Sequence, residues 1–224
     1  MSSVRVYVDP KVHKIIELYA DIFASDFHSL PIGMQLGLQA TRLAEAHQRR
    51  EDSVCFQIGS WHPDLVGQSD ERILNCSFNG DDAKITIARE YGFKDWGDVE
   101  AIEALASDVA FENAVDTMLS GNIDSLREQI EKRPELLRSR SQYGHRATLL
   151  HYAGTNGVES YRQVVPLNLA AIVDVLIAAG ADQHSSANIY GGSTPRQLFE
   201  SSQHSYKSTV YEDVVSVFNR YEST

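Results

Sequence analysis

The sequence has few cysteines and no stretch that resembles an export signal. Only Cys55 and Cys76 occur among 224 residues. A disulfide between them is one option, but so low a count is typical of free thiols in a reducing cytoplasm. Residues 1–10 contain no apolar core of the kind that a signal peptide needs. These absences predict a cytoplasmic protein.

Basic charge is also scarce. The chain has 20 Lys and Arg against 31 Asp and Glu, which gives a formal net charge of −11. Nonspecific binding to nucleic acid or to an anionic membrane needs a basic surface, so we expect neither kind of partner. No run approaches the roughly 18 apolar residues of a transmembrane helix. With 42% hydrophobic and 23% charged residues, the chain suits one elongated domain or two small ones.

Motifs for catalysis and metal binding are missing as well. Residues of zinc-binding types occur without the close spacing of a zinc site, at His47, Cys55, His62 and Cys76. Residues 190–194 form a glycine-containing loop that lacks the lysine of a P-loop. Ser202 and His204 are near each other, yet no Gly-x-Ser-x-Gly motif surrounds a serine. We therefore expect no catalytic residue, no metal and no cofactor.

What is present centres on residues 147–182. Thr148 can cap a short helix by accepting a backbone N–H bond, and Leu149, Leu150 and Ala153 then point inward. Gly157 is expected to end that helix in the left-handed conformation.

A second helix is predicted over residues 172–179. Its apolar stripe consists of Ile172, Val175, Leu176 and Ala179. Gly180 follows at the position after the cap, where a positive φ costs glycine little. Helices this short bury their apolar faces only against neighbours, so the pattern predicts a stack of helix pairs.

These two segments resemble the two helices of an ankyrin repeat, both in residue types and in spacing. The match covers residues 148–157 and 172–182. The resemblance implies that Thr148 and His151 brace the repeat through hydrogen bonds. Between the two segments, residues 158–167 form an insertion of about ten residues, and insertions in repeat proteins often lie on a binding face.

The rest of the chain is expected to be helical too. Residues 4–8 predict a short strand or an extended arm, and Asp9-Pro10 starts a helix. Residues 52–58 resemble residues 124–130, an offset of 124 − 52 = 72 or about two ankyrin-like units of roughly 33 residues, unless the likeness is coincidence. Residues 88–96 are similar to a short sequence motif that precedes ankyrin repeats in many bacterial proteins.

The predicted organisation therefore has two parts. Residues 1–106 form an N-terminal helical region, built either from degenerate repeats or from unrelated helices. Residues 107–224 form about three ankyrin-like repeats that end in a capping helix.

One segment departs from the acidic balance of the chain. Five of the 20 Lys and Arg fall within fifteen residues, joined by His145: Lys132, Arg133, Arg138, Arg140 and Arg146. One interpretation is a solvated loop whose charge Glu131 and Glu135 offset. The other is a basic patch that steers an acidic partner.

The sequence as a whole predicts an all-α fold, an ankyrin-like helical repeat solenoid after an N-terminal helical region. The expected function is a non-enzymatic module that binds a protein partner. Its contact residues would be Tyr143, His145, Arg146, Tyr152, Tyr161, Arg162 and Tyr190. The alternative is a small-ligand or catalytic pocket between the inserted loop and the repeat fingers. That pocket would use His145, Glu159, Arg162 and His204.

Overall fold

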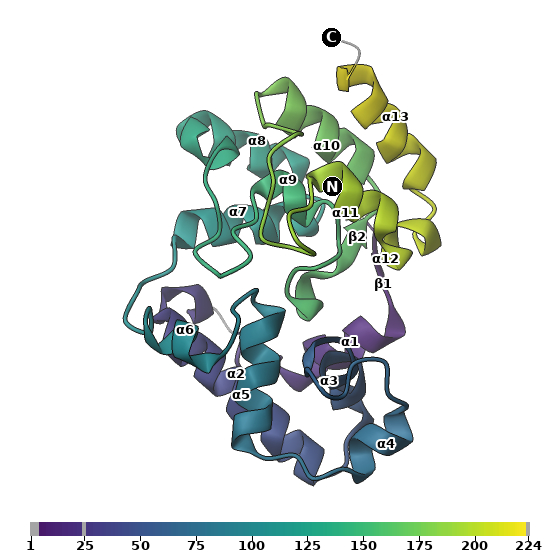
Figure 1. Ribbon diagram of the computed structural model, residues 1–224. Coiled ribbons are helices and arrows are strands. Elements are labelled where there is room, and N and C mark those ends of the chain that lie inside the picture. Colours follow the sequence, from purple (N-terminus) through teal and green to yellow (C-terminus); the bar gives the residue numbers. More distant parts are fainter. Residues whose placement is uncertain (1–4, 24–25, 223–224) are drawn as a thin grey trace. The chain divides into compact units, whose positions relative to one another are not determined.

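The computed structural model describes residues 5–23 and 26–222, and it is mostly helical (Figure 1). It divides into two compact units. The N-terminal unit consists of residues 10–107 together with residues 159–161. The C-terminal unit consists of residues 108–158 and those from 162 onward, and it also contains residues 5–9. The all-helical expectation is thus confirmed at the level of fold class, apart from two short strands.

The N-terminal unit is built from short helices around one long helix. They are α1 (Pro10–Leu18), η1 (Phe27–Ser29), α2 (Ile32–Gln48), η2 (Asp52–Val54), α3 (Cys55–Trp61), α4 (Asp70–Asn75), α5 (Gly80–Glu90) and α6 (Trp96–Glu100). Helix α2 packs along α5, and Leu36 and Leu43 of α2 are fully buried there with Ile87 of α5. Asn79 caps the N-terminus of α5: the amides of Asp81 and Asp82 both donate to its Oδ1, at 2.7 and 3.2 Å.

The C-terminal unit contains successive helix pairs. Its elements are β1 (Val6–Val8), α7 (Val109–Leu119), α8 (Ile123–Lys132), η3 (Pro134–Leu137), α9 (Leu149–Tyr152), β2 (Val164–Pro166), α10 (Leu169–Ala178), α11 (Pro195–Ser201), α12 (Gln203–Lys207) and α13 (Tyr211–Glu222). Helix α7 contacts α9, and α9 contacts α11. In the same order, α8 contacts α10, and α10 contacts α13.

The predicted insertion is structured. It holds the short 3-10 turn η4 (Ser160–Arg162) and the strand β2. Strand β2 pairs antiparallel with β1, with Tyr7 opposite Val165. Part of the expected N-terminal strand is therefore present, while its first residue, Val4, lies outside the described residues.

Two predicted helix details are corrected. Helix α9 ends at Tyr152, so Gly157, although its φ is +69°, is not the residue that ends it. In α10, Val173 is fully buried, whereas Ala179 is exposed beyond the helix end. Both cysteines are free thiols, as expected, and burial raises the pKa of Cys55 to about 11.

The expected role of Gly180 is confirmed. Its φ is +102°, and its amide donates to the carbonyl of Ile177 at 2.9 Å. The next amide, that of Ala181, donates to the carbonyl of Leu176 at 2.9 Å. These paired bonds form a Schellman motif, which satisfies the last carbonyls of α10 and requires the left-handed residue that glycine best supplies.

Replacing Gly180 with alanine is expected to destabilise the protein by about 1 kcal/mol or more, because a β-carbon is strained at this φ. Nothing lies within 4 Å of the added atom, so the effect would come from the backbone alone. The matched control is Gly37→Ala inside α2, where the added atom also meets nothing. Chemical denaturation should show Gly37→Ala to be neutral or stabilising; equal effects of the two substitutions would contradict the assignment.

Candidate interaction surface

Two loops of the C-terminal unit have the same hydrogen-bonded closure. In the first, which joins η3 to α9, the amide of Ser141 donates to the carbonyl of Ala147 at 2.8 Å. In the second, which joins α10 to α11, the amide of Ala187 donates to the carbonyl of Ser193 at 3.1 Å. Each bond spans six residues. We call residues 138–147 the first finger and residues 183–193 the second finger.

The two fingers are joined directly to each other. The amide of Asn188 donates to the carbonyl of His145 at 2.8 Å, and its side-chain amide donates to the carbonyl of Gly144 at 3.0 Å. The guanidinium of Arg140 donates at 2.8 Å to the carbonyls of both Arg146 and Ser186. Because these bonds involve backbone groups of both loops, they fix the fingers side by side.

Each finger leads into a helix that begins with a threonine. The Nδ1 atom of His151 lies 3.2 Å from the amide of Thr148 and 2.7 Å from its hydroxyl, and both donate to it. At the next helix, the amide of Thr194 donates to Oε1 of Gln197 at 2.9 Å, and Thr194 Oγ1 accepts from the amide of Gln197 at 3.3 Å. Thr148 and His151 are thus bonded to each other, as the resemblance implied, and Gln197 makes the corresponding bond to Thr194 at α11.

The exposed side chains of the fingers include one tyrosine and two arginines. Tyr190 is 65% exposed, and its hydroxyl donates to Asn156 at 3.0 Å. Arg138 and Arg146 are exposed, and neither forms an ion pair within the described chain. Both Arg146 (φ +54°) and Tyr190 (φ +49°) adopt the left-handed conformation, which is uncommon for residues other than glycine. The surrounding hydrogen bonds hold them in it.

Part of the basic segment is neutralised. Lys132 pairs with Glu128 at 3.4 Å on the surface of α8. Arg133 lies 3.0 Å from Glu135 and 3.8 Å from Asp108. The two interpretations of this segment therefore apply to different residues: its first two cations are paired, and Arg138 and Arg146 are left as positive charge at the first finger.

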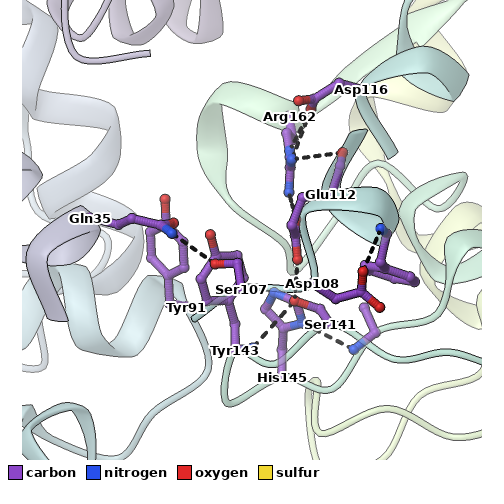
Figure 2. A network of polar contacts seen from close by, with 12 residues as sticks. Gln35, Tyr91, Ser107, Asp108, Glu112, Asp116, Ser141, Tyr143, His145 and Arg162 are labelled. Carbon is purple, nitrogen blue, oxygen red and sulfur yellow. Dashed lines mark hydrogen bonds and ion pairs between the residues drawn. The ribbon is translucent and has the colours of Figure 1, made fainter. Parts of the chain in front are cut away.

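Beneath the fingers lies a buried polar network, drawn in Figure 2. Arg162 is 2% exposed, and its Nη1 donates to Oε2 of Glu112 at 2.5 Å. Its Nη2 lies 2.8 Å from Oδ1 of Asp116. The other carboxylate oxygen of Glu112 accepts from the hydroxyl of Ser141 at 3.1 Å. This network links the inserted loop, helix α7 and the start of the first finger.

The network also includes aromatic contacts. The guanidinium of Arg162 lies 5.5 Å from the centre of the Tyr152 ring, within the range of a cation–π interaction. The ring of His145 lies 5.8 Å from that of Tyr152 and 5.9 Å from that of Tyr143. Nδ1 of His145 accepts from the amide of Ala147 at 3.1 Å. These groups support the first finger from inside the unit.

The structure separates the predicted contact residues into two groups. Tyr143, His145, Tyr152 and Arg162 are at most 2% exposed and belong to the buried network, so their predicted place on a contact surface is corrected. Arg146 and Tyr190 are exposed on adjacent fingers.

The remaining predicted contact, Tyr161, is half-buried in the N-terminal unit, where its ring centre lies 4.1 Å from that of Phe23. Arg162 therefore contributes no exposed side chain to a surface that includes the fingers. Its guanidinium is buried and contacts the carboxylates of Glu112 and Asp116 and the ring of Tyr152.

The residues of the alternative pocket are also buried. His145, Glu159 and Arg162 are at most 2% exposed, and His204 is 9% exposed. Burial lowers the pKa of His204, and its Nε2 lies 3.2 Å from Oε1 of Gln163. Glu159 belongs to the N-terminal unit, whereas the other three belong to the C-terminal unit. The alternative pocket stays a prediction.

Sequence reasoning missed the partners of Arg162 and the role of Asn188. Glu112 and Asp116 are one helical turn apart on α7, and Glu112 lies directly after Phe111 in the buried stripe. An acidic residue beside such a stripe is a signal for a buried cation, since a carboxylate is rarely buried alone. No comparable signal exists for Asn188, because its partners are backbone carbonyls of a distant loop.

Residues 5–23 and 26–222 contain neither a metal-binding cluster nor a membrane-spanning helix. No group of three or more His, Cys, Asp and Glu side chains in this part of the chain is arranged to hold a metal ion. None of its helices has the length and apolar character needed to cross a membrane. Comparisons of the chain with models of protein families, with curated proteins and with solved structures find no match.

The buried ion pairs generate a test of stability. Arg162→Met should destabilise the protein by about 3–5 kcal/mol, because it leaves the Glu112 carboxylate buried without its cation. Arg146→Met, on the exposed first finger, is the control and should change stability by less than about 0.5 kcal/mol. Chemical denaturation measures both variants; a loss below about 1 kcal/mol for Arg162→Met would contradict the network.

The second test concerns pH. Burial lowers the pKa of His151 to about 4, with the charge of Arg140 acting in the same direction. Since the ordinary value is about 6.5, the folded protein binds fewer protons than the unfolded chain between these pH values. Stability from this group is thus fully present above pH 6.5 and is lost as the pH falls towards 4, by about 3 kcal/mol at most.

The matched variant is His151→Gln, because Gln197 makes the equivalent bond to Thr194 without titrating. Unfolding free energies measured from pH 7 to pH 4 should fall less steeply for this variant than for the original protein. Identical slopes would show that His151 is not the group responsible.

Proposed function

We propose that this protein is a non-enzymatic interaction module, an ankyrin-like repeat stack that binds a protein partner through its two joined fingers. The partner surface that fits is acidic. The observation that carries the proposal is the pair of adjacent loops whose backbones are hydrogen-bonded to each other and whose exposed side chains include Arg138, Arg146 and Tyr190.

The order of helix contacts supports the repeat architecture. First helices α7, α9 and α11 contact one another in sequence, and second helices α8, α10 and α13 do the same. Glycines with positive φ follow α7 and α10, at Gly121 and Gly180, and both positions carry the hydrogen bonds of a Schellman motif. Such a stack buries each pair against its neighbours, which is how repeat proteins obtain a continuous core.

The spacing of the fingers supports it further. The closing bonds start at Ser141 and Ala187, which are 187 − 141 = 46 residues apart. Without the insertion of about ten residues, the spacing is about 36, close to one ankyrin-like unit. The insertion therefore enlarges one repeat and leaves the pairing of the fingers in place.

The charge of the fingers defines the partner. A chain with net charge −11 repels acidic proteins at long range. Arg138 and Arg146 provide local positive charge without intramolecular ion pairs in the described chain. Tyr190 adds a large amphipathic ring next to them, and Tyr and Arg are the residues that most often anchor protein interfaces. An acidic partner would thus bind here with a rate that falls as salt is added.

The test begins with a partner captured from native lysate by the full chain and identified by mass spectrometry. The double substitution Arg146→Glu with Tyr190→Ala should weaken its binding by tenfold or more, a loss of about 1.4 kcal/mol or greater. The control is Arg127→Glu, on the exposed surface of α8 away from the fingers, which should bind normally.

Dissociation constants are measured for both variants after circular dichroism shows that they are folded. Binding that is unchanged by the double substitution would exclude the fingers as the interaction surface. Equal weakening by the control would point to a general charge effect instead.

A further inference from the structure

A three-residue segment of the insertion belongs to the other unit. Residues Glu159–Tyr161, which we call the strap, are part of the N-terminal unit, while Val158 and Arg162 on either side belong to the C-terminal unit. The strap is therefore held by contacts with helices that are far away in the sequence.

Both the backbone and the side chains of the strap are bound. The amide of Ser160 donates to Oε1 of Glu90 at 2.7 Å. The indole Nε1 of Trp61 donates to the hydroxyl of Ser160 at 3.2 Å. The ring centre of Tyr161 lies 4.1 Å from that of Phe23. Glu90, at the end of α5, is thus the acceptor that holds the strap's backbone.

Glu90 is itself enclosed. It is 1% exposed, and Nε2 of Gln57 donates to its second carboxylate oxygen. The hydroxyl of Tyr19 donates in turn to Oε1 of Gln57 at 2.7 Å. Glu159 of the strap is fully buried and acts on Glu90 through its charge. A carboxyl group with such surroundings has a large cost of ionisation unless water reaches it.

We propose that the strap is a pH-sensitive latch: it stays seated in the N-terminal unit while Glu90 is neutral, and it leaves when Glu90 is ionised. A neutral carboxyl still accepts the Ser160 and Gln57 bonds, because it keeps acceptor capacity. An ionised Glu90 carboxylate becomes hydrated when the strap leaves the N-terminal unit. The buried Glu159 leaves together with the strap.

The direction follows from the groups around Glu90. Burial raises its pKa to about 7, and the charge of Glu159 acts in the same direction, while the bonds from Ser160 and Gln57 act against it. The titratable groups that face it are Glu159 from the strap and Tyr19, which directly follows α1; Arg42 of α2 acts on Tyr19.

With the strap open and the carboxyl hydrated, the pKa of Glu90 returns towards its ordinary value of about 4.3. The seated state therefore binds more protons than the open state, and it loses stability as the pH rises from about 4.3 through 7. Between pH 6 and pH 8 the ratio of open to seated strap should rise by about tenfold.

Hydrogen exchange of the full chain tests the latch. After correction for the intrinsic pH dependence of exchange, protection of the amides of residues 159–161 should fall about tenfold from pH 6 to pH 8. Glu90→Gln keeps the shape and an oxygen that can accept the Ser160 amide, loses the second acceptor towards Gln57 and does not ionise, so its protection should be the same at both pH values. A constant protection in the original protein, or an equal fall in the variant, would overturn the proposal.

Two further measurements keep the test decisive. Trp61→Phe removes the indole donor to Ser160 and should lower protection at every pH without changing the midpoint of the transition. If Glu90→Gln does not fold, the carbon-13 resonance of the Glu90 carboxyl in the original protein decides. A midpoint near 7 that coincides with the loss of strap protection supports the latch, and a midpoint below about 5 overturns it.

Discussion

The buried guanidinium of Arg162 is the interaction on which most of the C-terminal unit depends. It holds the inserted loop against α7 through Glu112 and Asp116. Glu112 also accepts a hydrogen bond from Ser141 at the base of the first finger. Removing one partner of such a pair leaves a charge without solvation or compensation, which is far more costly than the pair's net benefit. An arginine in an insertion thus becomes a structural residue, because its charge has already been matched inside the unit.

This burial determines which polar and aromatic side chains stay exposed. The inserted loop keeps its aromatic and cationic side chains for internal contacts, with Arg162 on Tyr152 and Tyr161 on Phe23. The fingers next to it keep Arg138, Arg146 and Tyr190 on the surface. The bonds between the fingers are made by backbone groups and by the side chains of Arg140 and Asn188. The fingers are therefore held rigidly, and the side chains of Arg138, Arg146 and Tyr190 are not needed for these bonds. A rigid surface loses less conformational entropy when a partner binds.

Much of the local structure could be predicted from the sequence. Gly121 and Gly180 follow apolar helical runs, and their positive φ values reflect a rule about the last turn of a helix that needs no distant contact. The buried stripe of α7, from Phe111 to Met118, and that of α13, from Val214 to Phe218, follow from helical spacing alone. The bond between Thr148 and His151 joins residues three apart, so residue type and spacing were sufficient there as well.

The sequence by itself therefore determined the helical class, the glycine stops, the scarcity of basic surface and the threonine-led helix starts, because each depends on interactions within a few residues. Tertiary structure alone decided which polar residues are buried. Arg162 and Arg146 look equally suitable for a binding surface in the sequence, yet Arg162 meets carboxylates 46 and 50 residues away and Arg146 meets none among the described residues. Glu90 likewise accepts the Ser160 amide only because a segment 70 residues later lies against it. Charge and hydrogen-bonding capacity are properties of a residue, but whether water or protein satisfies them is settled by which distant segments the fold brings together.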